Sequence, residues 1–464
     1  MITAASGLRE VACNLFLQSL ADCSVEQAFA HKVKRGASAA GRTFLTVGDD
    51  AIDLDRVRRI GVVAVGKAAS MMVKALLPLL QGPTQCDLSG LVITSEEPPD
   101  LPPGFQFFAG GHPTPNQASI DGAKAAVALV RLLRAKAATT DDSLCLFLIS
   151  GGASAMMELP LDPRISLEDT VKFHRELVHS GGSITEINCV RKHFSAVKGG
   201  RLALEAEGIL SYSLLVSDVP LGHLDALGSG PTLPDTSTVD QCKEILARYR
   251  LMERFPASVQ QFLLSAQLGE TPKPAYLASK AVTLLSPDDL AAIVRQRAGD
   301  LGFYAVVDNT CDDWNYGAAA EYLLSRLQGL RRDHKRVCLI SSGEVAVELP
   351  GASDFYCAEG DQRLGTGGRN QHFALYTATL LRQSDGSIAV LSAGTDGIDG
   401  NSFAAGAVVD DKTLFGEERR LSQAREALRR FDSGTFLQEA GLSIVTGATG
   451  NNLRDLRILL ATEC

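Results

Sequence analysis

The chain has 464 residues, a length typical of two or three domains, and its hydrophobic content of 45% is that of an ordinary globular protein. A net charge of −9 argues against a protein that binds nucleic acid through bulk positive charge, and no apolar run is long enough to span a membrane. Ten cysteines without a Cys-x-x-Cys pair and eight histidines without zinc spacing indicate packing or surface residues in a reducing compartment. We expect a cytoplasmic protein whose partners include neither nucleic acid nor a membrane.

The first segment, with apolar residues spaced between Leu8 and Leu20, predicts an amphipathic helix. No basic region followed by an apolar core precedes it, so we predict no signal peptide. The same pattern could hide a transit peptide, although Glu10 and Asp22 argue against one.

Strand-like apolar runs then alternate with helical patterns. Strands are expected at 60–65, 91–94, 144–149 and 214–216, and helices at 68–80 and 120–135. This alternation is typical of a parallel sheet covered by helices, in which ligands bind at the carboxyl ends of the strands.

Residues 267–274 carry a glycine and two prolines among polar residues, and they are the best linker candidate. This linker divides the chain into domains 1–266 and 275–464. The second domain continues with expected helices at 290–298 and 317–330 and expected strands at 281–285, 304–307, 337–340, 345–349, 388–391 and 404–409. The short spacing between 337–340 and 345–349 predicts a hairpin, so we expect a mixed second sheet.

Gly61 to Lys67 has the spacing of a Walker A motif, but the intervening residues form strands, and Ala68 stands where Ser or Thr would hold magnesium. What remains is Lys67, after Gly66, at the end of a buried strand. A lysine there is unfavourable unless it faces solvent or an anion, so we favour a substrate- or phosphate-binding lysine over a capping one.

Small residues follow the strand at 144–149, namely Ser150, Gly151, Gly152 and Ser154. They would let a ligand approach the backbone amides closely. A serine nucleophile is the rival interpretation, but the Gly-x-Ser-x-Gly elbow is absent.

Basic residues gather on the next predicted helix, which spans 187–197, and at its end: Arg191, Lys192, Lys198 and Arg201, with Gly199 and Gly200 between the last two. A solvated basic face and an anion-binding patch are both open interpretations. Asp218 then ends a strand pattern beside the small-residue loop 228–232. It suits magnesium or a substrate hydroxyl, or it forms an Asx-turn.

The most informative segment is the glycine loop 365–371, where Gly367, Gly368, Arg369 and Asn370 lead into a helical pattern. A glycine loop at a helix start favours anions because free N–H groups and the helix dipole attract negative charge. Arg369 adds a planar fork that fits phosphate or carboxylate. A surface turn with a capping arginine is the alternative.

Two further loops carry candidate residues. The strand at 388–391 runs into Thr395 and Asp396, which places a carboxylate at a strand end. The glycine–hydroxyl loop 446–453, which contains Thr449 and Asn451, precedes an expected final helix with Asp455 in its first turn.

Lysine, arginine, glycine amides and aspartates together indicate phosphoryl transfer, which requires positioning and charge neutralisation with a metal bridging the phosphates. Acyl transfer lacks a nucleophile with a positioned histidine. Hydride transfer lacks a Gly-x-Gly-x-x-Gly fingerprint after a strand.

Over nearly the whole chain, the order of these motifs resembles that of the class II glycerate kinases, or glycerate 2-kinases, some of which are labelled hydroxypyruvate reductases. Each motif alone is weak, but the shared order is specific. The motifs are Val65-Gly66-Lys67-Ala68, Gly111-His112-Pro113-Thr114-Pro115, Ser150-Gly151-Gly152-Ala153-Ser154, 188–201, Ser217-Asp218-Val219, 228–232, Gly367-Gly368-Arg369-Asn370-Gln371, Gly394-Thr395-Asp396-Gly397 and 447–455.

The resemblance implies ATP- and Mg²⁺-dependent phosphorylation of the 2-hydroxyl of D-glycerate, giving 2-phosphoglycerate. It implies an α/β protein with a larger Rossmann-like domain, a smaller α/β domain with a mixed sheet, and an active site in the interdomain cleft. The small-molecule substrate would be D-glycerate or a related hydroxy acid, and a homodimer is the assembly considered.

The family's lysine corresponds to Lys67, its arginine to Arg369, and its aspartates to Asp218 and Asp396. Lys67 and Arg369 would neutralise the phosphoryl group or hold the glycerate carboxylate. Either aspartate would hold magnesium or accept the hydroxyl proton. Further substrate or phosphate contacts are expected from Gly66, Ser150, Gly151, Gly152, Ser154, Arg191, Lys198, Gly199, Gly200, Gly367, Gly368, Asn370, Thr395, Thr449 and Asn451.

Two alternatives stay open: an NAD(P)H-dependent hydroxypyruvate reductase, and a non-catalytic sugar-acid or nucleotide-binding relative. The second is kept open by the first of three departures from the family pattern. Leu221-Gly222-His223 stand where the family carries Gly-Asp-Asp, so two carboxylates are missing. His372 replaces a common glutamate. Ala448 and Asn451 replace the usual proline and threonine.

Overall fold

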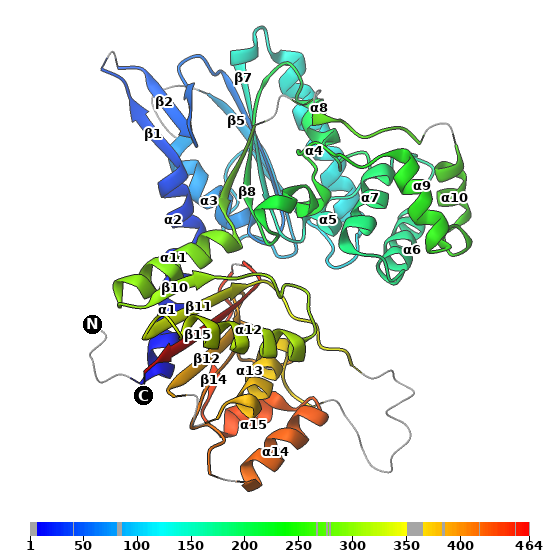
Figure 1. The fold of residues 1–464 in the computed structure, drawn as a ribbon. Coiled ribbons are helices and arrows are strands. Elements are labelled where there is room, and N and C mark those ends of the chain that lie inside the picture. The colour runs from blue at the N-terminus through cyan, green and yellow to red at the C-terminus, as the bar shows by residue number, and fades with distance from the viewer. Residues whose placement is uncertain are drawn as a thin grey trace. The chain divides into compact units, whose positions relative to one another are not determined.

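A computed structural model describes residues 7–463 except 40, 81–85, 266–267, 275–276, 278–279, 350–364, 383–385, 417 and 451. The chain forms two compact units (Figure 1): Val25–Ser286, here the parallel-sheet unit, and Met1–Ser24 with Pro287–Cys464, here the mixed-sheet unit. The domain limits expected from the linker stay a prediction, as does the expected active site in an interdomain cleft.

The parallel-sheet unit is built on six parallel strands in the order β6-β5-β4-β7-β8-β9. These are β4 (Arg59–Val65), β5 (Asp87–Thr94), β6 (Phe105–Ala109), β7 (Ser143–Ser150), β8 (Leu210–Val216) and β9 (Lys280–Leu285). Every residue of β7 is buried, as expected for a central strand covered on both faces. A separate antiparallel sheet consists of β1 (Val33–Ala37), β2 (Thr43–Val47) and β3 (Asp50–Asp53).

Nine helices of this unit lie in the described part of the chain: α2 (Val25–Lys32), α3 (Ala69–Leu80), α4 (Gln117–Lys136), α5 (Ala153–Met156), α6 (Leu167–Val178), α7 (Ile184–Phe194), α8 (Arg201–Glu205), α9 (Val239–Arg248) and α10 (Ala257–Leu264). Capping boxes start α4, α7 and α9 because polar side chains at their first turns satisfy free N–H groups. Helices α6, α7, α9 and α10 share an apolar core in which the Phe173 and Phe194 rings stack 3.9 Å apart. The helices expected at 68–80 and 120–135 are confirmed as α3 and α4, and the one expected at 187–197 is confirmed as α7, which ends at Phe194.

In the part of the mixed-sheet unit that the structure describes, six strands form one sheet in the order β10-β11-β15-β12-β13-β14. They are β10 (Tyr304–Val307), β11 (Arg336–Ser342), β12 (Ile388–Gly394), β13 (Gly406–Asp410), β14 (Ser443–Ile444) and β15 (Asp455–Thr462). Only β10 and β11 pair in parallel. The helices are α1 (Leu8–Asp22), α11 (Pro287–Asp300), α12 (Tyr316–Leu330), α13 (Arg369–Leu380), α14 (Glu418–Arg429) and α15 (Ser433–Glu439).

The expected mixed sheet is confirmed, but the reason given for it is wrong. Residues 345–349 form no strand in the described structure, apart from one bridge between Ala346 and Asn315, so there is no hairpin with β11. The neighbour of β11 is instead β15, which pairs antiparallel with both β11 and β12.

The expected final helix is also wrong, because its residues form β15 at the centre of this sheet. All residues of β15 except the last are buried, so its apolar side chains do not alternate with polar ones. A short continuous apolar run cannot be assigned to helix or strand by periodicity.

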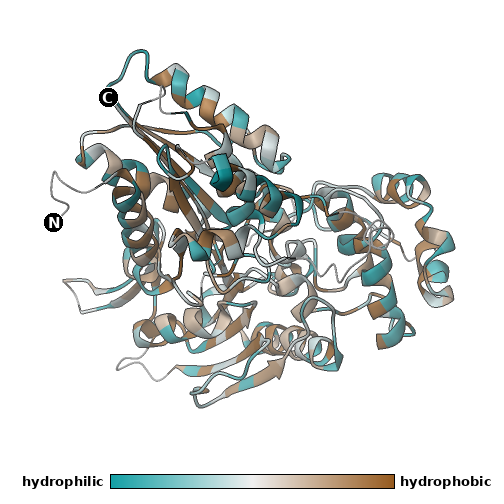
Figure 2. Ribbon diagram, turned by 90° about the horizontal axis from the view of Figure 1, so that it is seen from below, coloured by the Kyte–Doolittle hydropathy of each residue, from teal (hydrophilic) through white to brown (hydrophobic). Residues whose placement is uncertain are grey.

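Figure 2 shows the strands largely hydrophobic, whereas the helices also carry hydrophilic stretches. The predicted α/β class, with a parallel sheet and a mixed sheet, is confirmed. In the described structure, every helix is too short or too polar to cross a lipid bilayer.

Candidate active site

The carboxyl edge of the parallel sheet brings the loops after β4 and β7 together. The N–H of Lys67 donates to the carbonyl of Gly151 at 2.9 Å, and the N–H of Ala68 donates to the hydroxyl of Ser150 at 3.0 Å. Gly66 has a φ of +112°, and a Cβ at this position would collide with Ser150. These two loops therefore need small residues because their backbones are in direct contact.

Lys67 and Asp218 lie against the glycine pair that follows β7. A Cβ added to Gly151 would collide with the Asp218 carboxylate, and one added to Gly152 would lie 3.4 Å from Cγ of Lys67 and 3.3 Å from the His112 ring. Burial, and then the charge of Lys67, lower the pKa of His112. The structure thus gathers Lys67, Asp218 and the glycines at one edge.

His112 was missed as a site residue, although the Gly-His-Pro motif that contains it was noticed. Its position after β6 was the available signal, because the carboxyl ends of parallel strands share one edge of the sheet.

Ser154 begins a polar strip that leads from this edge to α7. Its hydroxyl lies 2.9 Å from the Ser229 hydroxyl, which donates to Oδ1 of Asn188 at 2.9 Å. The nearby Gly199 and Gly200 have positive φ, and their N–H groups donate to the carbonyls of Ser229 and Gly230. Those two amides therefore hold the fold, and a ligand would have to displace these bonds.

Lys198, an expected phosphate contact, is 1% exposed and its amine donates to Glu158 at 2.7 Å and to the Met157 carbonyl at 3.0 Å. Glu158 is 0% exposed and also pairs with His174 at 2.7 Å. Burial alone would raise the pKa of Glu158, but Lys198 and His174 outweigh it and hold that pKa well below its ordinary value. The amine of Lys198 is thus already bound to an internal carboxylate.

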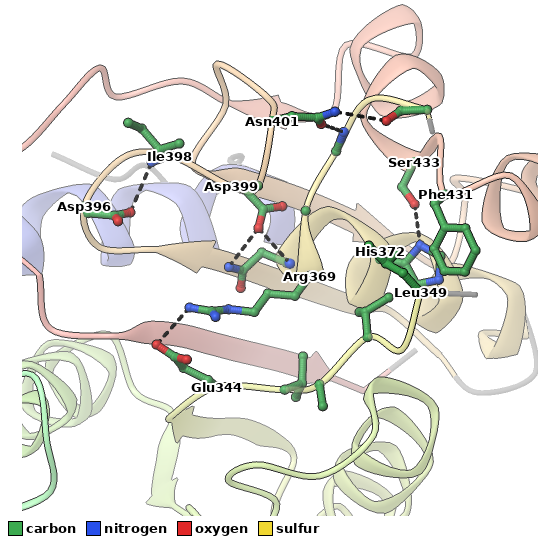
Figure 3. Close-up of a pocket in the computed structure, with 18 of the residues that line it drawn as sticks. Glu344, Leu349, Arg369, His372, Asp396, Ile398, Asp399, Asn401, Phe431 and Ser433 are labelled. Carbon is green, nitrogen blue, oxygen red and sulfur yellow. Dashed lines mark hydrogen bonds and ion pairs between the residues drawn. The ribbon is translucent and has the colours of Figure 1, made fainter. Parts of the chain in front are cut away.

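The mixed-sheet unit has a pocket of about 880 Å³ around the start of α13 (Figure 3). Gly367, Gly368, Arg369, Asn370 and Asp396 line it, so the structure brings these five predicted residues together. Figure 3 shows the side chain of Arg369 extended along the pocket toward Glu344.

Arg369 is paired with two acids. Its Nε donates to Asp455 at 2.5 Å, and its Nη2 lies 2.9 Å from Glu344. Burial opposes the charge, but the two carboxylates outweigh it and raise the pKa of Arg369 above its ordinary value. The side chain is 38% exposed, so part of the guanidinium remains accessible.

The helix start that was expected to bind a ligand anion already holds the carboxylate of Asp399. The N–H groups of Asn370 and Gln371 donate to its two oxygens at 3.0 and 2.7 Å, and the N–H of Gly367 donates to Asn401 at 2.8 Å. An internal carboxylate satisfies the free amides and the helix dipole as a phosphate would. Sequence reasoning named Asp396 in this loop and missed Asp399.

Asp399 makes the stability of this unit depend on pH. Burial, followed by the charge of Asp455, raises its pKa from 3.8 to about 6 against the hydrogen bonds that lower it. Because the folded protein binds this proton more tightly than the unfolded chain, Asp399 lowers stability as pH rises from about 4 to about 6. We expect the stability of wild type relative to Asp399→Asn to fall by about 3 kcal/mol between pH 4 and pH 7.

Urea unfolding of both proteins at several pH values measures this difference. A difference that stays constant would contradict the raised pKa, and one that grows with pH would show that the folded structure favours the ionised form.

Thr395 and Thr449 connect two loops of the mixed-sheet unit. The hydroxyl of Thr395 donates to the carbonyl of Arg454 at 2.7 Å, and the hydroxyl of Thr449 donates to the carbonyl of Thr395 at 2.7 Å. Asp396 accepts from the N–H of Ile398 at 3.2 Å. Asn451 lies outside the described residues. Thr395 and Thr449 thus hold the loop after β12 against the loop before β15.

His372, one of the departures from the family pattern, is buried beside this pocket. Its Nδ1 lies 2.9 Å from the Ser433 hydroxyl, and its ring stacks on Phe431 at 5.5 Å between centroids. Burial lowers the pKa of His372 to about 4, so the ring is neutral at physiological pH.

Among the described residues, no group of three or more His, Cys, Asp and Glu side chains is placed to hold a metal ion. The two expected metal ligands, Asp218 and Asp396, belong to no such larger group of ligands in the described structure. Asp218 belongs to the parallel-sheet unit and Asp396 to the mixed-sheet unit.

Comparisons with known proteins cover both units. Residues 11–264 match a family described as a domain of unknown function, DUF4147, and residues 337–455 match the MOFRL family. The D-glycerate 2-kinase of Thermotoga maritima is 34% identical over 416 residues, which are 88% of this chain and 91% of that protein. A glycerate 2-kinase of Pyrococcus horikoshii is 31% identical, covering 87% of this chain and 88% of its own length.

The solved structures agree with the sequence comparison. The crystal structure of a glycerate kinase from Thermotoga maritima matches with a TM-score of 0.77 at 30% identity, over 98% of this chain and 99% of that one.

Proposed function

The chain belongs to the glycerate 2-kinase family, and we propose that it transfers the γ-phosphoryl group of ATP to the 2-hydroxyl of D-glycerate. The observation that carries the proposal is the grouping of Lys67 and Asp218 around Gly151 and Gly152, at the carboxyl edge of a parallel sheet. A cation, a carboxylate and closely approachable backbone are what phosphoryl transfer requires of a protein.

In the proposed reaction, the 2-hydroxyl oxygen bonds to the γ-phosphorus while the bond from that phosphorus to the bridging oxygen of ADP breaks. ADP leaves with the electron pair, and the hydroxyl proton passes to a base. We assign Lys67 to neutralise charge on the transferred group, and Asp218 to accept the proton or to bind the metal.

Mg²⁺ would enter as part of the nucleotide substrate. In kinase sites it takes one or two carboxylates together with substrate phosphates and waters, so a single carboxylate such as Asp218 suffices as a protein ligand. Arg369 is the second expected cation and Asp396 the second expected carboxylate. A cytoplasmic location and a homodimer belong to the same proposal, and light scattering after size-exclusion chromatography tests the homodimer.

A coupled assay of ADP release tests the function. We expect ADP to form only when D-glycerate, ATP and Mg²⁺ are all present, with L-glycerate as the matched control. If hydroxypyruvate oxidised NADH or NADPH and no ADP formed, the protein would be a reductase and not a kinase. Thermal stabilisation by ligand without any turnover would indicate a non-catalytic binding protein.

A further inference from the structure

Arg191 on α7 differs from the other cations of its neighbourhood. Its Nε is buried, and among the described residues it has neither a hydrogen-bond acceptor nor a carboxylate within ion-pair distance. Lys192 is paired with Asp225 and Asp235, and Lys198 is paired with Glu158. Arg191 as a whole is only partly buried, but a guanidinium whose buried Nε has no partner is unfavourable, so the fold retains a cation that an anion would stabilise.

The charges around Arg191 lead to the same conclusion. Glu158 is the carboxylate that interacts electrostatically with Arg191, but it already binds Lys198 and His174. Burial lowers the pKa of His174, so that ring is neutral near pH 7. Arg191, Lys198 and Glu158 therefore form a cluster of two cations and one carboxylate, which has an excess of one positive charge.

Arg191 is connected to the candidate active site through the polar strip. It lies one helical turn from Asn188, on the same face of α7. Asn188 accepts a hydrogen bond from Ser229, whose hydroxyl contacts Ser154. Ser154 follows Gly152 by two residues, so the strip ends beside the glycines that Lys67 and Asp218 contact.

We infer that the guanidinium of Arg191 binds the carboxylate of the hydroxy-acid substrate, an assignment that rests on the proposed function. A carboxylate brings the single negative charge that the cluster lacks, and it fits the arginine fork with two parallel hydrogen bonds. The hydroxyl and amide groups of Ser154, Ser229 and Asn188 suit the neutral hydroxyls of such a substrate. The more highly charged nucleotide phosphates would remain with Lys67.

Substrate pairs and substitutions test the assignment. D-Glycerate and glycerol share a three-carbon skeleton, but glycerol lacks the carboxylate. We expect Arg191→Gln to lower kcat/KM for D-glycerate by about 10²-fold, mainly through KM, because a charged partner is lost. Neither KM for ATP nor kcat/KM for glycerol should change, and Arg191→Lys should recover part of the loss. Arg175→Gln, at an exposed arginine of α6, is the matched control.

Two results would overturn the assignment. An unchanged KM for D-glycerate in Arg191→Gln would show that the carboxylate binds elsewhere. A rise in KM for ATP alone would move Arg191 to the nucleotide.

Thermal unfolding separates this inference from the proposed function. Without ligand, Arg191→Gln should unfold at the same temperature as wild type or higher, because it removes a partly buried charge whose Nε has no partner. D-Glycerate should raise the Tm of wild type and of Arg175→Gln but not of Arg191→Gln. If wild type lacks kinase activity, the proposed function fails while these shifts still test Arg191. Equal shifts in all three proteins, or none in wild type, would refute the inference.

Discussion

Lys67→Ala is expected to lower the turnover number for D-glycerate phosphorylation by about 10²- to 10³-fold, because it removes a positioned charge from the transferred phosphoryl group. The fold should be retained, since the backbone N–H of Lys67, rather than its side chain, makes the 2.9 Å bond to Gly151. Steady-state kinetics with saturating ATP and D-glycerate measure the loss, and circular dichroism checks the fold.

The matched control is Lys74→Ala, at an exposed lysine of α3, the helix that follows Lys67. This change should leave turnover within about twofold of wild type, as expected for a surface residue away from the site. If Lys67→Ala also turned over at that rate, Lys67 would have no part in the chemistry.

Glu158→Gln should destabilise the parallel-sheet unit by about 3–5 kcal/mol, because it leaves the buried amine of Lys198 without its carboxylate. The folded pKa of Glu158 lies below its ordinary 4.5, so its contribution is present above about pH 4.5 and is lost as pH falls below it. The difference between wild type and variant should therefore be largest near neutral pH. Urea unfolding at pH 7 and at low pH measures it.

Two further variants serve as controls for the stability loss in Glu158→Gln. Glu205→Gln breaks an ion pair whose arginine partner is exposed, and it should cost less than about 1 kcal/mol. The double variant Glu158→Gln/Lys198→Met should recover much of the stability lost by Glu158→Gln, because no unpaired charge remains. A loss below 1 kcal/mol in Glu158→Gln itself would contradict the buried pairing.

The sequence predicted the parallel-sheet unit well, because its strands and helices alternate with clear changes of period. It also predicted which loops meet: Lys67, Gly151 and Asp218 each follow a strand, and parallel strands end at one edge of their sheet. It failed at β15, because a central strand buried on both faces shows no alternation that distinguishes it from a buried helix.

Burial and long-range pairing set the surroundings of two charged residues in ways that the sequence did not show. Lys198 was taken for an anion contact, but it binds Glu158, which lies 40 positions away. Asp399 was overlooked in favour of Asp396, although it caps a helix start 29 positions earlier. Local sequence patterns do not reveal partners that lie so far away in the chain. Only the folded structure shows whether a charged side chain is bound to another residue or is available to a ligand.

Phosphorus NMR of the product tests the central claim most directly. After incubation with ATP, Mg²⁺ and D-glycerate, the account predicts a new phosphomonoester signal split into a doublet by the single proton on carbon 2. A triplet from the two protons on carbon 3 would contradict transfer to the 2-hydroxyl, and the absence of any phosphorylated glycerate would contradict the kinase altogether.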